Sequence, residues 1–221
     1  MVFEGAPLAI RFYARLMQVV SNRQTSVVSR LEELGVDPDE VGLVILSHFH
    51  PDHIGGSRFF RNARFLCSKV GYEKVCRRPR RLGFYRALLP LDFEQRCEFV
   101  EDRPVVRDES LACFGRVFDL FGDGSVLSVL IDGHAPCQVA CLIQGVKRSC
   151  FLVADSAWSR EAILKRRLPH WLTRFVHDDW QSLAANLYLL NRLARENENW
   201  VFLPTHCRVS LSEGFFRLNQ K

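Results

Sequence analysis

The pattern of apolar and polar residues along the chain predicts a mixed α/β protein. Short apolar runs of the kind found in buried strands are followed by turn residues, and longer stretches carry apolar residues at helical spacing. The predicted strands lie at residues 41–46, 63–67, 117–120, 126–131, 139–143, 149–154 and 200–203. The predicted helices lie at residues 1–22, 26–34, 160–167 and 180–196.

Polar and small residues set the ends of several of these elements. Thr25 or Ser26 can cap the second helix, and Gly35 can end it in a left-handed turn. Asp178 or Asp179 can cap the long helix over residues 180–196. The Asp-Gly pair in residues 121–125 predicts a hairpin turn, whereas residues 88–104 show no clear periodicity and are expected to be irregular.

Composition narrows the class of protein. With 221 residues, 48% hydrophobic and 25% charged, the chain can bury a core, and one domain over residues 1–221 is expected. It has no apolar run of about 18 residues and no signal-peptide pattern at its start, so neither a membrane span nor a membrane partner is predicted. The eight Cys form no C-x-x-C pair, which favours reduced thiols and a cytoplasmic location.

The net charge of +5 is mild, and part of it is concentrated in residues 74–86. This basic run is either an ordinary solvated face or a patch that steers an anionic substrate or an acidic carrier protein. No nucleic acid is expected as a partner, because few aromatic residues and no recognised binding motif accompany the run. A homodimer is left open.

The most informative stretch is residues 41–56, where an apolar strand leads into a loop with four potential metal ligands. His48, His50, Asp52 and His53 fall within six residues. Alternate residues on extended chain point the same way, so His48 and His50 can bind one ion together, and the other two can reach a second. Imidazole and carboxylate ligands are typical of hydrolytic zinc sites.

The sequence His48-Phe49-His50-Pro51-Asp52-His53 resembles the signature of the metallo-β-lactamase superfamily, which includes β-lactamases, glyoxalase II-type thioesterases and quorum-quenching lactonases. The resemblance implies an αβ/βα sandwich of two mixed β-sheets flanked by helices, with metals at one edge. Members usually open with two or more strands before the metal loop. This chain begins with helix-like sequence, so the usual N-terminal strands are expected to be missing.

The same resemblance implies three further ligands. His134 follows a strand in Gly-His-Ala-Pro-Cys-Gln, similar to the family's G-H-x-P-G-H motif, with Cys137 and Gln138 in place of Gly and His. Asp155 ends a strand as the bridging aspartate does, and His206 follows the last strand. The implied sites of two Zn²⁺ ions are therefore composed as follows: His48, His50 and His134 for the first, and Asp52, His53 and His206 for the second, with Asp155 bridging.

On this reading a hydroxide between the two ions attacks the substrate, and Asp52 doubles as a catalytic acid or base. His170 and His177 match no family metal position and are expected to be structural or on the surface, with a role in the substrate pocket as the alternative.

The expected substrate is a small-molecule lactone or related ester, because the motifs are most similar to those of the acyl-homoserine lactonases. Those lactonases carry a Tyr shortly after the bridging Asp, where this chain has Trp158. An indole can donate a hydrogen bond but cannot titrate as a phenol does. Two alternatives remain: a thioesterase of the same fold acting on acyl-CoA or carrier-protein thioesters, and a non-catalytic metal-binding or truncated family member.

Overall fold

The computed structural model describes residues 26–79 and 81–207. Their contacts gather in two compact units: unit 1 within residues 1–67 and 75–98, and unit 2 within residues 68–74 and 99–221. The helix predicted at residues 1–22, and with it the question of missing N-terminal strands, lies outside the described residues. The single domain over residues 1–221 stays a prediction.

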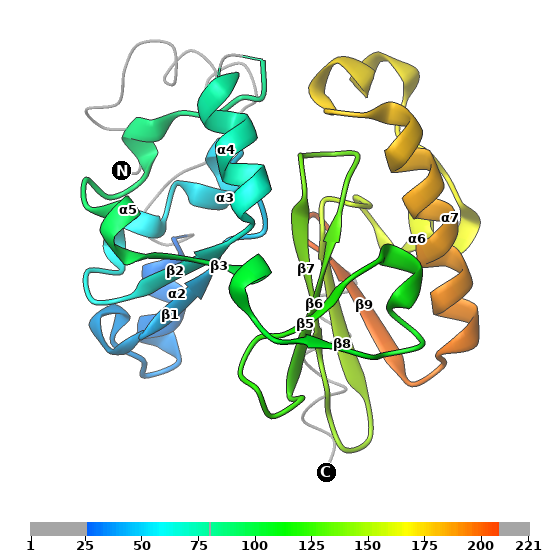
Figure 1. The fold of residues 1–221 in the computed structure, drawn as a ribbon, viewed down its shortest axis with the longest axis horizontal. Helices are drawn as coiled ribbons and strands as arrows, with labels where there is room; N and C mark the ends of the chain where they lie inside the picture. The colour runs from blue at the N-terminus through cyan, green and yellow to red at the C-terminus, as the bar shows by residue number, and fades with distance from the viewer. Residues whose placement is uncertain (1–25, 80, 208–221) are drawn as a thin grey trace. The chain divides into compact units, whose positions relative to one another are not determined.

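Unit 1 is built on a small sheet with strand order β1-β2-β3, in which β1 and β2 are parallel (Figure 1). Its strands are β1 (Leu43–Ile45), β2 (Arg64–Cys67) and β3 (Cys97–Phe99), the last of which reaches into unit 2. Its helices are α2 (Val27–Glu33), α3 (Pro51–Ile54), the end of α4 (Lys69–Arg77) and α5 (Phe93–Arg96), with 3₁₀ turns at Pro38–Glu40, Ser57–Phe59 and Arg86–Leu88.

The ends of α2 follow the sequence prediction. The Ser26 Oγ accepts a hydrogen bond from the Ser29 backbone N–H at 3.2 Å, which satisfies one of the unpaired donors of the first turn. Gly35 has φ +73°. This left-handed conformation commonly ends a helix, and glycine adopts it with less strain than other residues. The predicted cap and stop are both confirmed.

The prediction that residues 88–104 are irregular is wrong in part. Within these residues lie α5, β3 and a 3₁₀ turn at Val100–Asp102. Both α5 and β3 are shorter than the window in which hydrophobic periodicity becomes visible. The polar residues of β3 are tolerated because this strand lies at the edge of its sheet.

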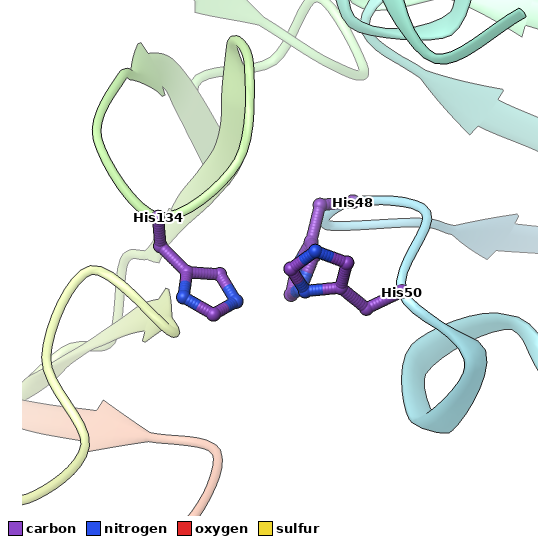
Figure 2. Close-up of side chains that lie close together, drawn as sticks. All are labelled: His48, His50 and His134. Atoms are coloured by element: carbon purple, nitrogen blue, oxygen red, sulfur yellow. The ribbon is translucent and has the colours of Figure 1, made fainter. Parts of the chain in front are cut away.

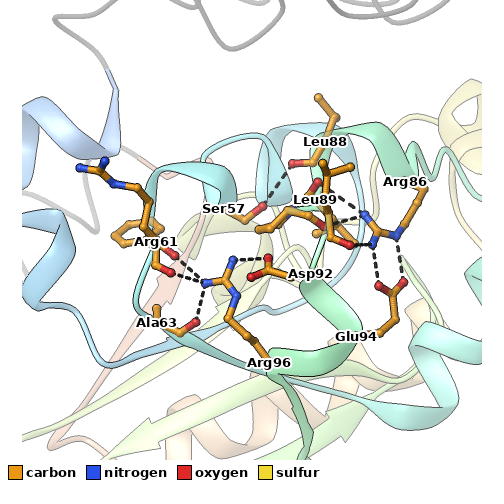
Figure 3. A network of polar contacts seen from close by, with 12 residues as sticks. Ser57, Arg61, Ala63, Arg86, Leu88, Leu89, Asp92, Glu94 and Arg96 are labelled. Atoms are coloured by element: carbon orange, nitrogen blue, oxygen red, sulfur yellow. Dashed lines mark hydrogen bonds and ion pairs between the residues drawn. The ribbon is translucent and has the colours of Figure 1, made fainter.

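Two arginines hold the irregular parts of unit 1 together (Figure 3). The Nη1 of Arg96 lies 2.9–3.0 Å from three backbone carbonyls of the segment before β2, and its Nη2 donates to Asp92 Oδ1 at 2.8 Å. Arg86 pairs with Glu94 and also donates to the Pro90 carbonyl at 2.8 Å. Since a guanidinium has five donors in a fixed plane, each of these side chains ties several loop carbonyls at once.

Unit 2 is built on a six-stranded sheet with strand order β4-β5-β6-β7-β8-β9, antiparallel except for the parallel pair β8 and β9. Its strands are β4 (Val105–Val106), β5 (Val117–Asp119), β6 (Val126–Ile131), β7 (Gln138–Ile143), β8 (Ser149–Ala154) and β9 (Trp200–Pro204). Its helices are α6 (Arg160–Lys165) and α7 (Trp180–Glu196), with 3₁₀ turns at Ala112–Phe114 and Trp171–Val176.

The core of unit 2 lies between this sheet and its helices. Leu187, Leu190 and Leu193 of α7 pack with Phe151 of β8 and Phe202 of β9. The stripe of leucines predicted for this helix therefore faces the sheet, as a 3.6-residue period requires. Figure 1 shows α7 running along the sheet with α6 beside it.

The predicted turn between β5 and β6 is confirmed, and Asp119 fixes it. Its carboxylate accepts hydrogen bonds from the backbone N–H groups of Phe121, Gly122 and Gly124. Both of these glycines have positive φ. None of the helices in the described part of the chain has the length and apolarity needed to cross a bilayer.

We expect Arg96→Lys to lower the free energy of unfolding by about 1–3 kcal/mol, because the single nitrogen of a shorter lysine cannot replace both the Nη1 contacts to the carbonyls and the Nη2 contact to Asp92. Urea unfolding measures this change. Arg64→Lys is the matched control, since Arg64 is exposed and its pair with Glu98 is worth about 1 kcal/mol at most. Equal effects of the two substitutions would contradict this role for Arg96.

Candidate metal centre

The loop after β1 presents the first predicted ligands of unit 1. Phe49 is buried between the two histidines of the motif, with its ring 5.7 Å from that of Phe84 and 6.4 Å from that of Phe93. This anchor fixes the loop, because successive side chains of extended backbone point to opposite sides. Figure 2 shows the side chains of His48 and His50 on this loop.

The nitrogen atoms of these two histidines are spaced as zinc ligands. His48 Nε2 lies 3.0 Å from His50 Nδ1. Two ligand atoms on a tetrahedral zinc, each about 2.1 Å from the ion, lie about 3.4 Å apart, so a small adjustment suffices. The Ser47 Oγ lies 3.1 Å from His48 Nδ1 and 3.3 Å from His53 Nδ1. If both histidines carry their proton on Nδ1 and donate it to this hydroxyl, their Nε2 atoms are left to bind a metal.

Asp52 and His53 lie in α3, the short helix that continues the loop. Pro51 starts this helix, where its missing N–H costs nothing. Asp52 Oδ2 lies 3.6 Å from His53 Nε2. The Asp52 side chain is 38% exposed and that of His53 only 8%. The Asp52 carboxylate is therefore the one of these two groups that can readily exchange protons with solvent.

In unit 2, His134 sits where the loop after β6 meets the start of α7. The backbone N–H groups of Asp178 and Asp179 donate to the carbonyls of His134 and Gly133, at 3.1 and 2.9 Å. Gly133 has φ +130°, and a Cβ there would lie 2.6 Å from the backbone of Leu183. Glycine is therefore required for this close approach of helix and loop.

The three ligand candidates of unit 2 lie together around Asp155. It follows β8 directly after Ala154, which has φ +45°, and it is 3% exposed. Its Oδ2 lies 3.3 Å from His134 Nε2 and 3.2 Å from His206 Nε2. These separations also match the spacing of two ligand atoms on one zinc ion, and one carboxylate oxygen is the point on which both rings converge.

Gln138 supports the turn that carries Asp155. Its Nε2 donates to Ser156 Oγ at 2.6 Å, and its Oε1 accepts from the Asp155 backbone N–H at 3.3 Å. Sequence reasoning recognised Gln138 only as a departure from the family motif. Its buried amide therefore holds the turn at Asp155 through the Val153 carbonyl, the Asp155 N–H and the Ser156 hydroxyl.

His177 is the residue whose contact the sequence did not reveal. It is buried, and its Nδ1 lies 3.1 Å from His134 Nδ1. Burial lowers the pKa of His177, opposed by the nearby Asp155 carboxylate, so the ring tends to be neutral. Its place two residues before Asp179, the cap of α7, was the available signal. The other unassigned histidine, His170, is exposed and accepts from the Leu172 backbone N–H.

A cavity of about 170 Å³ lies beside Asp155 within unit 2. Its walls come from the segment after β8, from α6 and from α7, and they are mostly apolar. They comprise Asp155, Ser156, Ala157, Trp158, Ser159, Ala162, Arg167, Leu168, Pro169, Leu183 and Leu187. An apolar cavity of about 150 Å³ can hold a molecule of the size of benzene, so this one can take an apolar group of about six carbons.

Each unit thus brings its own predicted ligands together: four in unit 1 and three in unit 2. Comparison with known proteins defines the class. The model of the metallo-beta-lactamase superfamily matches residues 13–196, and the chain belongs to this superfamily.

Curated relatives with similar sequences are lactonases. N-acyl homoserine lactonase AttM of Azorhizobium caulinodans is 29% identical over 159 residues, which cover 71% of this chain and 57% of AttM. An N-acyl homoserine lactonase of Bacillus thuringiensis is 35% identical over 52 residues, or 24% of this chain and 21% of the relative. The chain thus spans little more than half the length of the AttM lactonases that it matches.

Solved structures agree on the fold. A variant of Bacillus thuringiensis AiiA with N-decanoyl-L-homoserine bound has a TM-score of 0.64 at 16% identity, over 87% of this chain and 66% of that one. AidC, a dizinc quorum-quenching lactonase, has a TM-score of 0.59 at 19% identity, over 86% and 65%. The predicted fold class, two sheets flanked by helices in the metallo-β-lactamase fold, is confirmed.

We expect Gly133→Ala to destabilise the protein by about 2–4 kcal/mol, because the new methyl group meets the backbone of α7 and the positive φ is strained. Gly42→Ala is the control, since a Cβ there meets nothing within 4 Å. Thermal and urea unfolding compare the two variants. A Gly133→Ala variant as stable as Gly42→Ala would show that the helix start is not packed against this loop.

Proposed function

We propose that the chain is a zinc-dependent hydrolase of lactones or related esters, and that both units contribute to one centre with two ions. His48, His50 and His134 bind the first ion in this proposal, Asp52, His53 and His206 bind the second, and Asp155 bridges them. The observation that carries it is the convergence of His134 and His206 on one buried carboxylate oxygen of Asp155. Family membership supports the same ligand set.

The donor chemistry of each unit fits zinc. Five imidazoles and two carboxylates are nitrogen and oxygen ligands of the types zinc takes, and the ligand-atom spacings within each unit need little change to accept an ion. When bound, two zinc ions supply a hydroxide at neutral pH and polarise a substrate carbonyl.

The protein side chains supply positions and protons. Ser47 fixes the rings of His48 and His53, and Gln138 fixes the backbone of Asp155. Asp52 is the more solvent-accessible carboxylate, so we assign to it the proton transfer toward the leaving group. A carboxylate that exchanges protons with water can be reset after each turnover.

The apolar cavity beside Asp155 favours a substrate with an apolar group of modest size. A lactone or ester with a short alkyl or acyl substituent meets this requirement. The lactone class is also the class named for the curated relatives, which are called N-acyl homoserine lactonases.

A second candidate function is thioester hydrolysis with an acidic carrier or coenzyme as partner. Among the residues of the basic run that the structure describes, Lys74, Arg77, Arg78 and Arg81 are exposed. Arg86 pairs with Glu94 and donates to a loop carbonyl, so it contributes to stability. The third candidate is a metal-binding member without activity. Assays of lactone and thioester cleavage distinguish it from the other two.

We expect His50→Ala to lose zinc and to reduce hydrolysis by more than about a hundredfold, beyond what loss of a supporting residue costs. Metal analysis of the purified full chain and initial rates measure the two effects. His170→Ala is the control, because His170 is exposed and outside the proposed ligand set. Retained turnover in His50→Ala would reject the proposed centre.

A substrate panel separates the candidate functions. We expect γ-lactones with alkyl substituents of up to about six carbons to be cleaved faster than acyl-CoA thioesters of matched length, because the cavity fits such groups. Faster thioester cleavage, lost when Arg77 and Arg78 are changed to Glu, would favour the thioesterase. A zinc-loaded chain inactive on both series would be a non-catalytic member.

A further inference from the structure

We propose that His177 positions His134 by accepting the hydrogen bond of the His134 Nδ1 proton, so that the Nε2 atom of His134 is held ready for a cation. The inference rests on the proposed function, because it concerns His134 as a metal ligand. The inference also goes beyond the proposed function, because it assigns a role to His177, which is outside the ligand set.

The argument begins with the proton between the two rings. His134 Nδ1 and His177 Nδ1 are 3.1 Å apart, and two ring nitrogens at this distance form a hydrogen bond only if one of them carries the proton. A histidine that binds a metal through Nε2 keeps its proton on Nδ1. His134 is then the donor, and His177 must accept through Nδ1 and carry its own proton on Nε2.

The surroundings of His177 fit a neutral acceptor ring. His177 is 7% exposed, and the ring centroids of Trp158 and Trp180 each lie 5.6 Å from its own. Its Nε2 is buried and makes no hydrogen bond within residues 26–79 and 81–207. A neutral ring between two indoles costs less than a charged one, which would lack a counter-ion contact at that nitrogen.

Backbone hydrogen bonds hold the segments that carry His134 and His177 next to each other. The residues that follow His177, Asp178 and Asp179, donate their N–H groups to the carbonyls of His134 and Gly133. Asp179 is also the N-cap of α7 and accepts from Gln181 and Ser182. The position of His177 is therefore set by the start of the long helix, which is packed in the core of unit 2.

On the opposite side of the His134 ring, Nε2 lies 3.3 Å from Asp155 Oδ2. His134 thus has one nitrogen directed to His177 and the other to the carboxylate proposed to bridge the ions. Such outer contacts orient a ligating histidine and raise its basicity, and their loss typically costs 10–100-fold in metal affinity.

Three substitutions of His177 test this role. In His177→Asn the amide oxygen takes the place of Nδ1 and can still accept, whereas His177→Gln places its oxygen near the former Nε2. His177→Leu removes the acceptor at similar volume. We expect zinc affinity, measured on the full chain by competition with a chromophoric chelator, to fall 10–100-fold in His177→Leu and His177→Gln but only a few-fold in His177→Asn.

Two further measurements exclude a purely structural role. Chelator-treated wild type and variants are compared by thermal unfolding, and similar midpoints for His177→Asn and His177→Leu are expected. Nitrogen-15 spectra of the imidazole rings of the zinc-loaded wild type are expected to place the His134 proton on Nδ1, and to show faster exchange of this proton in His177→Leu.

The outcomes are distinct. Equal zinc affinity of wild type and His177→Leu would overturn the role of His177 while leaving the metal centre intact. Affinity lost equally in His177→Asn, His177→Gln and His177→Leu would also overturn it, since the acceptor at the Nδ1 position would then be irrelevant. A wild-type chain that takes up no zinc would reject the proposed function itself, and this inference with it.

Discussion

The buried carboxylate of Asp155 is the constraint around which unit 2 is arranged. An ionised carboxylate that is 3% exposed is tolerated only with compensating donors or cations around it. Two imidazole Nε2 atoms lie 3.2 and 3.3 Å from its Oδ2, on the loops after β9 and β6, and in the proposed centre the cations held by these three side chains would compensate its charge. The ends of three strands must therefore be held at one place, and this requirement accounts for the left-handed Ala154 and the close-packed Gly133.

The departures from the family motif are physically consistent with this arrangement. Gln138 is neutral at every pH, and it holds the Asp155 turn through one donor and one acceptor of the same amide. Cys137 has φ +45°, a conformation that glycine adopts with less strain, and its backbone N–H donates to Asp132. Burial and the neighbouring Asp132 raise the pKa of Cys137 to about 11, so its thiol stays protonated and inert.

How far sequence predicts this protein depends on the length of each element. The leucine stripe of α7 and the apolar strands β6 to β8 extend over enough residues for their periods to be read, and they were predicted nearly to the residue. Strand β3 has three residues and was missed. The ligand candidates were found because they form short motifs, and their assignment to one metal centre stays a prediction.

The supporting contacts could not be read from the sequence in the same way. His177 lies 43 residues from His134, and no local pattern relates them. Their contact exists because the start of α7 is hydrogen-bonded to the loop after β6, which is a property of packing and not of spacing. Ser47 could have been suspected from its place next to His48, but a serine at a strand end has many ordinary roles.

Trp158 shows how one substitution at a site changes what its neighbours can do. Its indole lines the cavity beside Asp155, and its ring lies 5.6 Å from that of His177 at an interplanar angle of 34°. A side chain committed to a wall and to a ring contact is not free to act as a phenol would at a reacting carbonyl, and its N–H cannot release a proton near neutral pH. In the proposed hydrolase the cations would supply that polarisation, so the orientation of ligands such as His134 becomes more important. The Trp158 ring also contacts that of His177, so Trp158 supports the proposed positioning of His134.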